Sequence, residues 1–195
     1  EVVKTYLPEV PSGAFEDKRV KIVFTDGRKY VEGCIKEGSL FDIVICDVTD
    51  PGGPSRYLYT LEFYKMIKSI LNKPGVIVTH AESPFFHLKE FLTITVTLSE
   101  VFEVARPYKA WIPSFGAPWA FVLASNDREL DPYLLSKAQV ERVIHERALS
   151  TLLKYYGPDI HLELFALPRF LVDKLEEAKK EKMVATDKRP IYMEV

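Results

Sequence analysis

The sequence lacks the features that mark several large classes of protein. It holds two cysteines, Cys34 and Cys46, which are too few for a disulfide framework. A reduced, cytoplasmic setting fits such a pair best. No apolar run reaches the roughly 18 residues of a membrane-spanning helix. The net charge is only −2, so a basic groove for nucleic acid is not expected.

Several common catalytic motifs are also missing. The four histidines show no HExxH spacing and the cysteines form no CxxC pair, so no metal site is expected. There is no GxSxG turn for a serine nucleophile. Gly52-Gly53 is too short to act as a phosphate-binding loop. Any chemistry must therefore come from other residues.

What is present is the pattern of one α/β domain. With 195 residues, of which 47% are hydrophobic, the chain is long enough for a single large domain. Residues 20–25, 41–46 and 75–79 read as strands, and the last two are apolar enough to be buried on both faces, as in a parallel sheet. Helices are expected at residues 28–37, 61–71 and 86–101.

The pattern changes after residue 101. Residues 102–111 and 119–124 read as two strands joined by a short link, which makes them antiparallel. A long helical region is expected from Asp131 to a break at Gly157-Pro158, and a final helix at residues 169–181. Together the elements predict a doubly wound α/β sheet with an antiparallel edge.

Acidic residues follow one of the apolar strands. Asp47 and Asp50 leave the strand at residues 41–46 in a tight loop, at the edge where ligands bind in such sheets. Two close carboxylates repel each other unless they meet a cation, so the loop suits a metal ion or an organic amine. The equally weighted alternative is ordinary turn chemistry, in which the carboxylates bond their own backbone.

Two further groups are candidates for ligand contact. Asp26-Gly27 follows the strand expected at residues 20–25, where a carboxylate can accept from a ribose hydroxyl or a base amino group, although a simple turn is the favoured alternative. Tyr57 and Tyr59 follow the acidic loop and are candidates for the wall of an apolar cleft. Phe63, by contrast, is expected to pack in the core.

Taken in order, these residues resemble a known family. The stretches that carry the resemblance are Thr25-Asp-Gly-Arg28, the run at 43–51 that ends in Asp47-Val-Thr-Asp50-Pro51, Gly53-Pro54, Leu58-Tyr-Thr60 and Phe63-Tyr64. They are similar to the polyamine aminopropyltransferases, the spermidine synthase family, and later stretches at 81–84, 112–115 and 119–125 agree. The resemblance implies a Rossmann-like, mostly parallel sheet of the kind found in S-adenosylmethionine-dependent methyltransferases.

The resemblance also implies a reaction. Such enzymes move an aminopropyl group from decarboxylated S-adenosylmethionine, a co-substrate, to a polyamine and release methylthioadenosine, with no cofactor. Asp47 matches the family's general base, and Asp50 matches the residue that orients the cationic acceptor. Tyr59 and Phe115 are expected at the acceptor, and the donor is expected to contact Asp26, Gly27 and Pro54. A homodimer or homotetramer is expected, with no nucleic-acid or membrane partner.

Some residues depart from the usual family pattern. Gly52-Gly53-Pro54-Ser55-Arg56 replaces an apolar-Gly-Pro-Ala-Glu stretch, Phe115 stands where many spermidine synthases have Tyr, and His80 replaces a Gln. These versions look more like the thermospermine synthase branch. The expected acceptor is therefore spermidine, giving thermospermine or spermine, with putrescine as the second choice.

The family begins with a β-hairpin domain and a Gly-rich turn that the numbered chain does not contain. Residues 1–7 read instead like the end of a helix stopped by Pro8. We therefore interpret residues 1–195 as the C-terminal catalytic domain of a longer protein. Two alternatives stay open: an S-adenosylmethionine-dependent methyltransferase, whose sheet would read much the same, and a non-catalytic polyamine-binding fragment.

Overall fold

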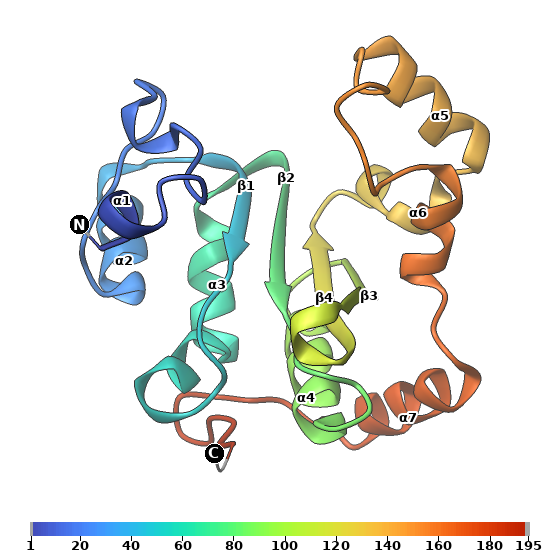
Figure 1. Ribbon diagram of the computed structural model, residues 1–195. Coiled ribbons are helices and arrows are strands. Elements are labelled where there is room, and N and C mark those ends of the chain that lie inside the picture. Colours follow the sequence, from blue (N-terminus) through green and yellow to red (C-terminus); the bar gives the residue numbers. More distant parts are fainter. Residues whose placement is uncertain (1, 194–195) are drawn as a thin grey trace.

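The computed structural model describes residues 2–193. At its centre is a four-stranded sheet in the order β1-β2-β4-β3 (Figure 1). Strands β1 and β2 are parallel, whereas β4 runs antiparallel to both β2 and β3. The predicted α/β class with an antiparallel edge is therefore confirmed. The strands are β1 (Phe41–Cys46), β2 (Leu71–His80), β3 (Val104–Ile112) and β4 (Ala117–Ser125).

The two faces of the sheet differ in what covers them. Along β1, Val44 and Cys46 face the core, whereas Ile43 and Ile45 point the opposite way and are 61% and 72% exposed. This alternation follows from the two-residue period of a strand. Within the described residues β1 is an edge strand of the sheet, so Ile43 and Ile45 have a neighbouring strand on one side only.

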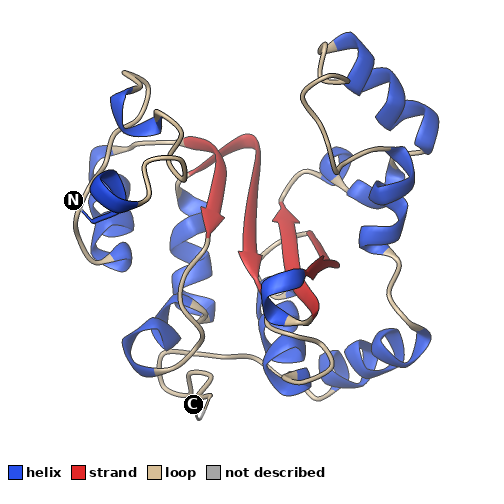
Figure 2. Cartoon of the chain, viewed as in Figure 1, coloured by secondary structure: helices blue, strands red, loops and turns tan. Residues whose placement is uncertain are grey.

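The covered face packs against three helices, α2 (Gly27–Glu37), α3 (Leu61–Ser69) and α4 (Leu88–Ser99) (Figure 2). The predicted apolar face of α3 is buried, including Phe63, and Thr60 caps the helix by accepting a hydrogen bond from the Phe63 N–H. A further helix, α7 (Arg169–Lys180), packs on α4 from outside. Within residues 2–193, no helix has the length and apolar character needed to cross a membrane.

The other face is covered at the β3 edge. There α6 (Pro158–Phe165) packs on β3, and the Phe165 and Tyr108 ring centroids lie 5.2 Å apart. Helix α5 (Lys137–Glu146) packs on α6 in turn. Toward β1 the same face is exposed, as Ile43 and Ile45 show.

The strand predicted at residues 20–25 was wrong. This segment is irregular backbone, and Phe24 is 96% exposed. An isolated extended segment leaves its N–H and C=O groups unpaired, so strand propensity counts only where a neighbouring strand supplies the ladder. No such ladder partner for residues 20–25 occurs within the described chain.

The long helical region predicted from Asp131 was also wrong. It divides into one 3-10 turn (Pro132–Leu134), helix α5, and a loop before α6. Ala148 follows α5 with φ at 52°, a left-handed conformation that ends a helix. Pro158 opens α6 rather than closing a helix, because its missing N–H costs nothing in the first turn. At the other end of the chain, α1 (Val2–Tyr6) agrees with the predicted helix end, while Glu1 lies outside the described residues.

The last described residues return across the starts of α2 and α3. We call residues 184–193 the C-terminal strap. Its Asp187 accepts two hydrogen bonds from the Arg28 guanidinium, at 2.9 and 2.6 Å. Farther along, the Met193 N–H donates to the Pro51 carbonyl at 3.2 Å. The strap therefore ties the start of α2 to the acidic loop after β1.

We expect Asp187→Asn to lower the free energy of unfolding by about 1 kcal/mol at neutral pH, because a partly exposed ion pair contributes little. Hydrogen bonds from Arg28, and one from Thr60, hold the pKa of Asp187 below its ordinary value. The contribution is therefore full above about pH 4 and disappears as the pH falls through the lowered pKa. Urea unfolding at pH 7 and pH 3 measures it, with Asp173→Asn on α7 as the exposed control. An equal loss at both pH values would contradict the assignment.

Candidate active site

A cavity of about 550 Å³ lies over the exposed face of the sheet, at the carboxyl ends of β1 and β2. Polar side chains in its lining include Asp47, Asp50, Thr79 and His80. One wall is aromatic, where the Phe115 and Trp119 ring centroids lie 4.5 Å apart. Apolar side chains make the rest of the lining, including Ile43, Ile45, Val78, Tyr108, Ile112 and Phe121. The cavity thus combines an apolar surface with negative charge at one side.

The acidic loop presents both of its carboxylates to this cavity. Asp47 and Asp50 are exposed, and within residues 2–193 neither carboxylate accepts a hydrogen bond. The loop is closed by other groups: the Ser55 hydroxyl lies 2.6 Å from the carbonyl oxygens of Asp50 and Gly52. The turn therefore does not occupy the carboxylates, and the alternative that they serve only the backbone is not what the structure shows.

Behind the loop lies a buried pair of aromatic side chains. The Tyr59 hydroxyl donates to the Thr49 carbonyl at 2.9 Å and lies 2.5 Å from His80 Nε2. Tyr59 is fully buried, and burial raises the pKa of its hydroxyl. Tyr59 has no exposed surface and does not line the cavity, and its expected contact with the acceptor stays a prediction. Tyr59 instead supports His80, which does line the cavity.

Charge and burial act in opposite directions on His80. Burial lowers the pKa of its imidazole, while a hydrogen bond to the Val48 backbone and the charges of Asp50 and Asp47 oppose that shift. The net result is a lowered pKa, so the ring is neutral at pH 7. Its Nδ1 lies 3.7 Å from Oε1 of the buried Glu82. Because the imidazole carries no charge, this contact is not an ion pair at neutral pH.

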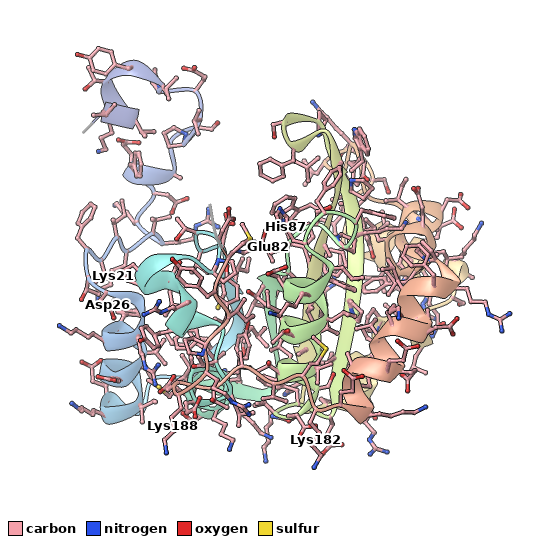
Figure 3. The ribbon with its side chains drawn as sticks, turned by 90° about the horizontal axis from the view of Figure 1, so that it is seen from below. Lys21, Asp26, Glu82, His87, Lys182 and Lys188 are labelled. Atoms are coloured by element: carbon pink, nitrogen blue, oxygen red, sulfur yellow. The ribbon has the colours of Figure 1, made fainter. Side chains whose placement is uncertain are left out.

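The sequence analysis did not single out Glu82, which lies in the stretch at residues 81–84, although the structure brings its carboxyl within 4.8 Å of Asp50 and His80. The signal that was available is a charged residue directly after a buried strand, a place where charge has no structural reason to occur. Glu82 lies in the segment between β2 and α4 and is labelled in Figure 3.

The residues expected at the donor lie apart from the cavity. Asp26 caps α2, since its carboxylate accepts from the Lys29 N–H at 2.9 Å. Gly27 is the first residue of that helix, and Pro54 lies in the 3-10 turn η2 (Gly53–Leu58). None of the three lines the cavity, and Figure 3 shows Asp26 well separated from Glu82. Their contact with a donor stays a prediction.

The chain is similar to proteins of known type. The spermine/spermidine synthase domain family matches residues 1–133. A polyamine aminopropyltransferase of Korarchaeum cryptofilum is 41% identical over all of this chain and 58% of its own length. One from Saccharolobus islandicus is 40% identical over 99% of the chain and 61% of its own length. The chain thus spans about three-fifths of the length of these curated relatives.

Solved structures agree. A spermidine synthase in complex with the transition-state analogue AdoDATO matches 90% of this chain and 57% of its own, with a TM-score of 0.76 and 31% identity. The spermidine synthase of Thermotoga maritima matches with a TM-score of 0.74 and 30% identity, over 90% of this chain and 56% of its own. With the family match over residues 1–133, these likenesses show that the chain belongs to the spermine/spermidine synthase family.

Proposed function

We propose that the chain transfers an aminopropyl group from decarboxylated S-adenosylmethionine to a polyamine and releases methylthioadenosine. The observation that carries this proposal is the pair of carboxylates of Asp47 and Asp50 at the side of an apolar cavity. Within residues 2–193 neither of them accepts a hydrogen bond. A polyamine is an alkyl chain that ends in ammonium groups. The apolar lining suits its chain, and the carboxylates suit its charge.

The transfer reaction itself needs few further groups from the protein. The acceptor nitrogen forms a bond to the aminopropyl carbon beside the sulfonium, and the carbon–sulfur bond breaks with its electron pair passing to sulfur. No oxyanion forms, so the requirements are position and a neutral amine. An alkylamine has a pKa of about 10 and arrives protonated. Asp47 takes the proton, and Asp50 orients the cation.

We infer that the donor nucleoside lies where α2 meets η2. Asp26 and Gly27 open α2, and the guanidinium of the next residue, Arg28, donates to the Tyr57 carbonyl in η2 at 3.3 Å. That contact holds the start of α2 beside the turn that contains Pro54. The assignment of Asp26, Gly27 and Pro54 to the donor rests on this proximity and on the family resemblance.

Product analysis tests the proposal directly. The purified chain is incubated with decarboxylated S-adenosylmethionine and, in turn, with putrescine, agmatine, cadaverine and spermidine. Methylthioadenosine and a new polyamine should form together in equal amounts. The methyltransferase alternative predicts methylated product from S-adenosylmethionine instead. A polyamine that binds without any product would favour the non-catalytic alternative.

We expect spermidine to be preferred over putrescine by about tenfold or more in kcat/KM. Phe115 offers an apolar surface to the cavity, and a site that lacks a polar partner rejects the substrate that needs one. Phe115→Tyr should shift the preference toward putrescine in the same assay, whereas Phe170→Tyr, a matched change on the exposed side of α7, should not. Equal use of both amines by the unaltered chain would refute the prediction.

The oligomeric state and the cellular location are proposed from the family resemblance. We propose a homodimer or homotetramer in the cytoplasm. Both cysteines are buried and unpaired, in keeping with a reduced compartment. Sedimentation analysis of the purified chain would measure the oligomeric state.

A further inference from the structure

Glu82 is held in an unusual state. Its side chain is fully buried, and neither carboxyl oxygen has a hydrogen-bond partner within the described residues. Its backbone adopts φ of 64°, a left-handed conformation that a non-glycine residue seldom takes. Hydrogen bonds of 2.8 Å on either side, from the Ala81 N–H to Ala120 and from the Ala120 N–H to Glu82, hold that conformation in place. Strain and unmet polar groups at one residue are typical of functional sites.

The carboxyl of Glu82 lies close to the acidic loop. A carboxylate oxygen of Asp50, a ring nitrogen of His80 and a carboxyl oxygen of Glu82 all lie within 4.8 Å of one another. Asp50 is exposed at the cavity, His80 lines it, and Glu82 lies behind them. A cation bound to Asp50 would therefore act on Glu82 at close range and through a poorly hydrated region, where charges interact strongly.

His80 lies between the Tyr59 hydroxyl and Glu82. Its Nε2 is 2.5 Å from that hydroxyl, which also donates to the Thr49 carbonyl. Its Nδ1 is 3.7 Å from Oε1 of Glu82. Because the ring is neutral at pH 7, it supplies no positive charge that would stabilise an ionised Glu82.

The surrounding charges also favour a protonated carboxyl. Asp50 and Glu90, the charged groups that face Glu82 from the acidic loop and from α4, are both negative. His80 is faced by Asp47, Asp50 and the Tyr59 hydroxyl, which add no positive charge. Burial, followed by these two negative charges, raises the pKa of Glu82 to about 8. With no cation in the site, the carboxyl therefore carries its proton at neutral pH.

We propose that Glu82 is a third carboxyl of the acceptor site, protonated in the empty site and ionised when a polyamine ammonium binds beside Asp50. This proposal rests on the proposed function, because it takes a polyamine as the ligand. On binding, the O–H bond of Glu82 breaks, the proton leaves to solvent past His80 at the cavity edge, and the carboxylate balances the ammonium. Glu82 acts here by charge, as a positioning residue behind Asp50.

Such a site has a defined pH dependence. Below pH 8 each polyamine that binds must expel one proton from Glu82. The titration of Glu82 alone should therefore raise the affinity of the chain for the polyamine about tenfold per pH unit, and this rise should level off above pH 8. In Glu82→Gln, which cannot ionise, the number of protons released per polyamine should fall by one. The difference between the two proteins removes the contribution of the amine's own titration, which both share.

Infrared difference spectroscopy on the purified chain tests the proposal, with spermidine as the probe. At pH 6.5 a protonated-carboxyl band should be present, should be lost on addition of saturating spermidine, and should be missing in Glu82→Gln. Calorimetry in buffers of different ionisation enthalpy then counts the released protons. Glu100→Gln, the same change at the exposed end of α4, is the matched control and should retain the band. His80→Gln should also retain it, which keeps the test open if Glu82→Gln does not fold.

Two results would overturn the proposal. The first is no protonated carboxyl at pH 6.5, and the second is a band that spermidine leaves unchanged although calorimetry shows that spermidine binds. Either result leaves the proposed transferase activity standing, because neither measurement uses the donor. A chain that binds no polyamine at all would overturn both.

Discussion

Asp47→Asn is expected to lower kcat by about 10²–10⁴-fold, the usual effect of losing a general base. Asp47 directly follows β1, so a paired strand fixes its backbone at the side of the cavity. Asparagine keeps the shape of the side chain but cannot take the proton from the attacking amine. Steady-state kinetics at saturating donor and acceptor measure the loss. Methylthioadenosine should bind as before, since the proposed nucleoside contacts lie at α2 and η2.

A pH series separates this role from simple binding of the acceptor. If Asp47 only holds the amine while water takes the proton, raising the pH deprotonates the amine and should restore most of the activity of Asp47→Asn. Asp42→Asn, at an exposed position of the same strand, is the control and should keep normal turnover. Near-normal turnover of Asp47→Asn at neutral pH would remove the assignment.

Arg106→Met is expected to lower the free energy of unfolding by about 2–3 kcal/mol. Arg106 forms hydrogen bonds with both carboxylate oxygens of Asp131, the shortest at 2.5 Å, and its guanidinium lies 4.5 Å from the centre of the Tyr133 ring. Asp131 is buried, so removing the arginine leaves a buried, uncompensated carboxylate. This expected loss of unfolding free energy is smaller than the usual about 3–5 kcal/mol for breaking a buried pair, because the Arg106 side chain is 37% exposed.

Thermal and urea unfolding measure this loss, which corresponds to about 2–4 °C in Tm per kcal/mol for a chain of this size. Arg106 lowers the pKa of Asp131, so the difference should be full above about pH 4 and shrink as the pH falls and Asp131 takes a proton. Arg142→Met breaks an exposed pair with Glu146 and should cost under about 0.5 kcal/mol. A comparable cost for both variants would contradict the argument.

The sequence predicted the elements whose signal is local. The strands at β1 and β2 have apolar centres, and α3 has both a threonine cap and an apolar face, so each could be recognised without knowledge of its neighbours. Residues 20–25 carry an equally good strand composition, but a strand also needs a partner. That requirement is a property of the sheet and not of the segment, which is why this prediction failed.

The site divided in the same way. Asp47 and Asp50, which line the cavity, could be named because two acids at a strand end are visible in the sequence, and Phe115 because it departs from a family pattern. Their roles stay predictions. The buried position of Tyr59 could not be read from its spacing, since it depends on a hydroxyl reaching back to Thr49. Glu82 was not singled out because what distinguishes it, a buried carboxyl with no hydrogen-bond partner within residues 2–193, appears only in three dimensions.

The C-terminal strap bears on how the chain is made. Asp187 is 159 residues from Arg28, so this ion pair cannot form until nearly all of the described chain has left the ribosome. Until then α2 and the acidic loop lack the contact that joins them, although β1, β2 and the helices between them can already fold. Synthesis from the N-terminus therefore allows the sheet to form first, and the strap crosses the starts of α2 and α3 last.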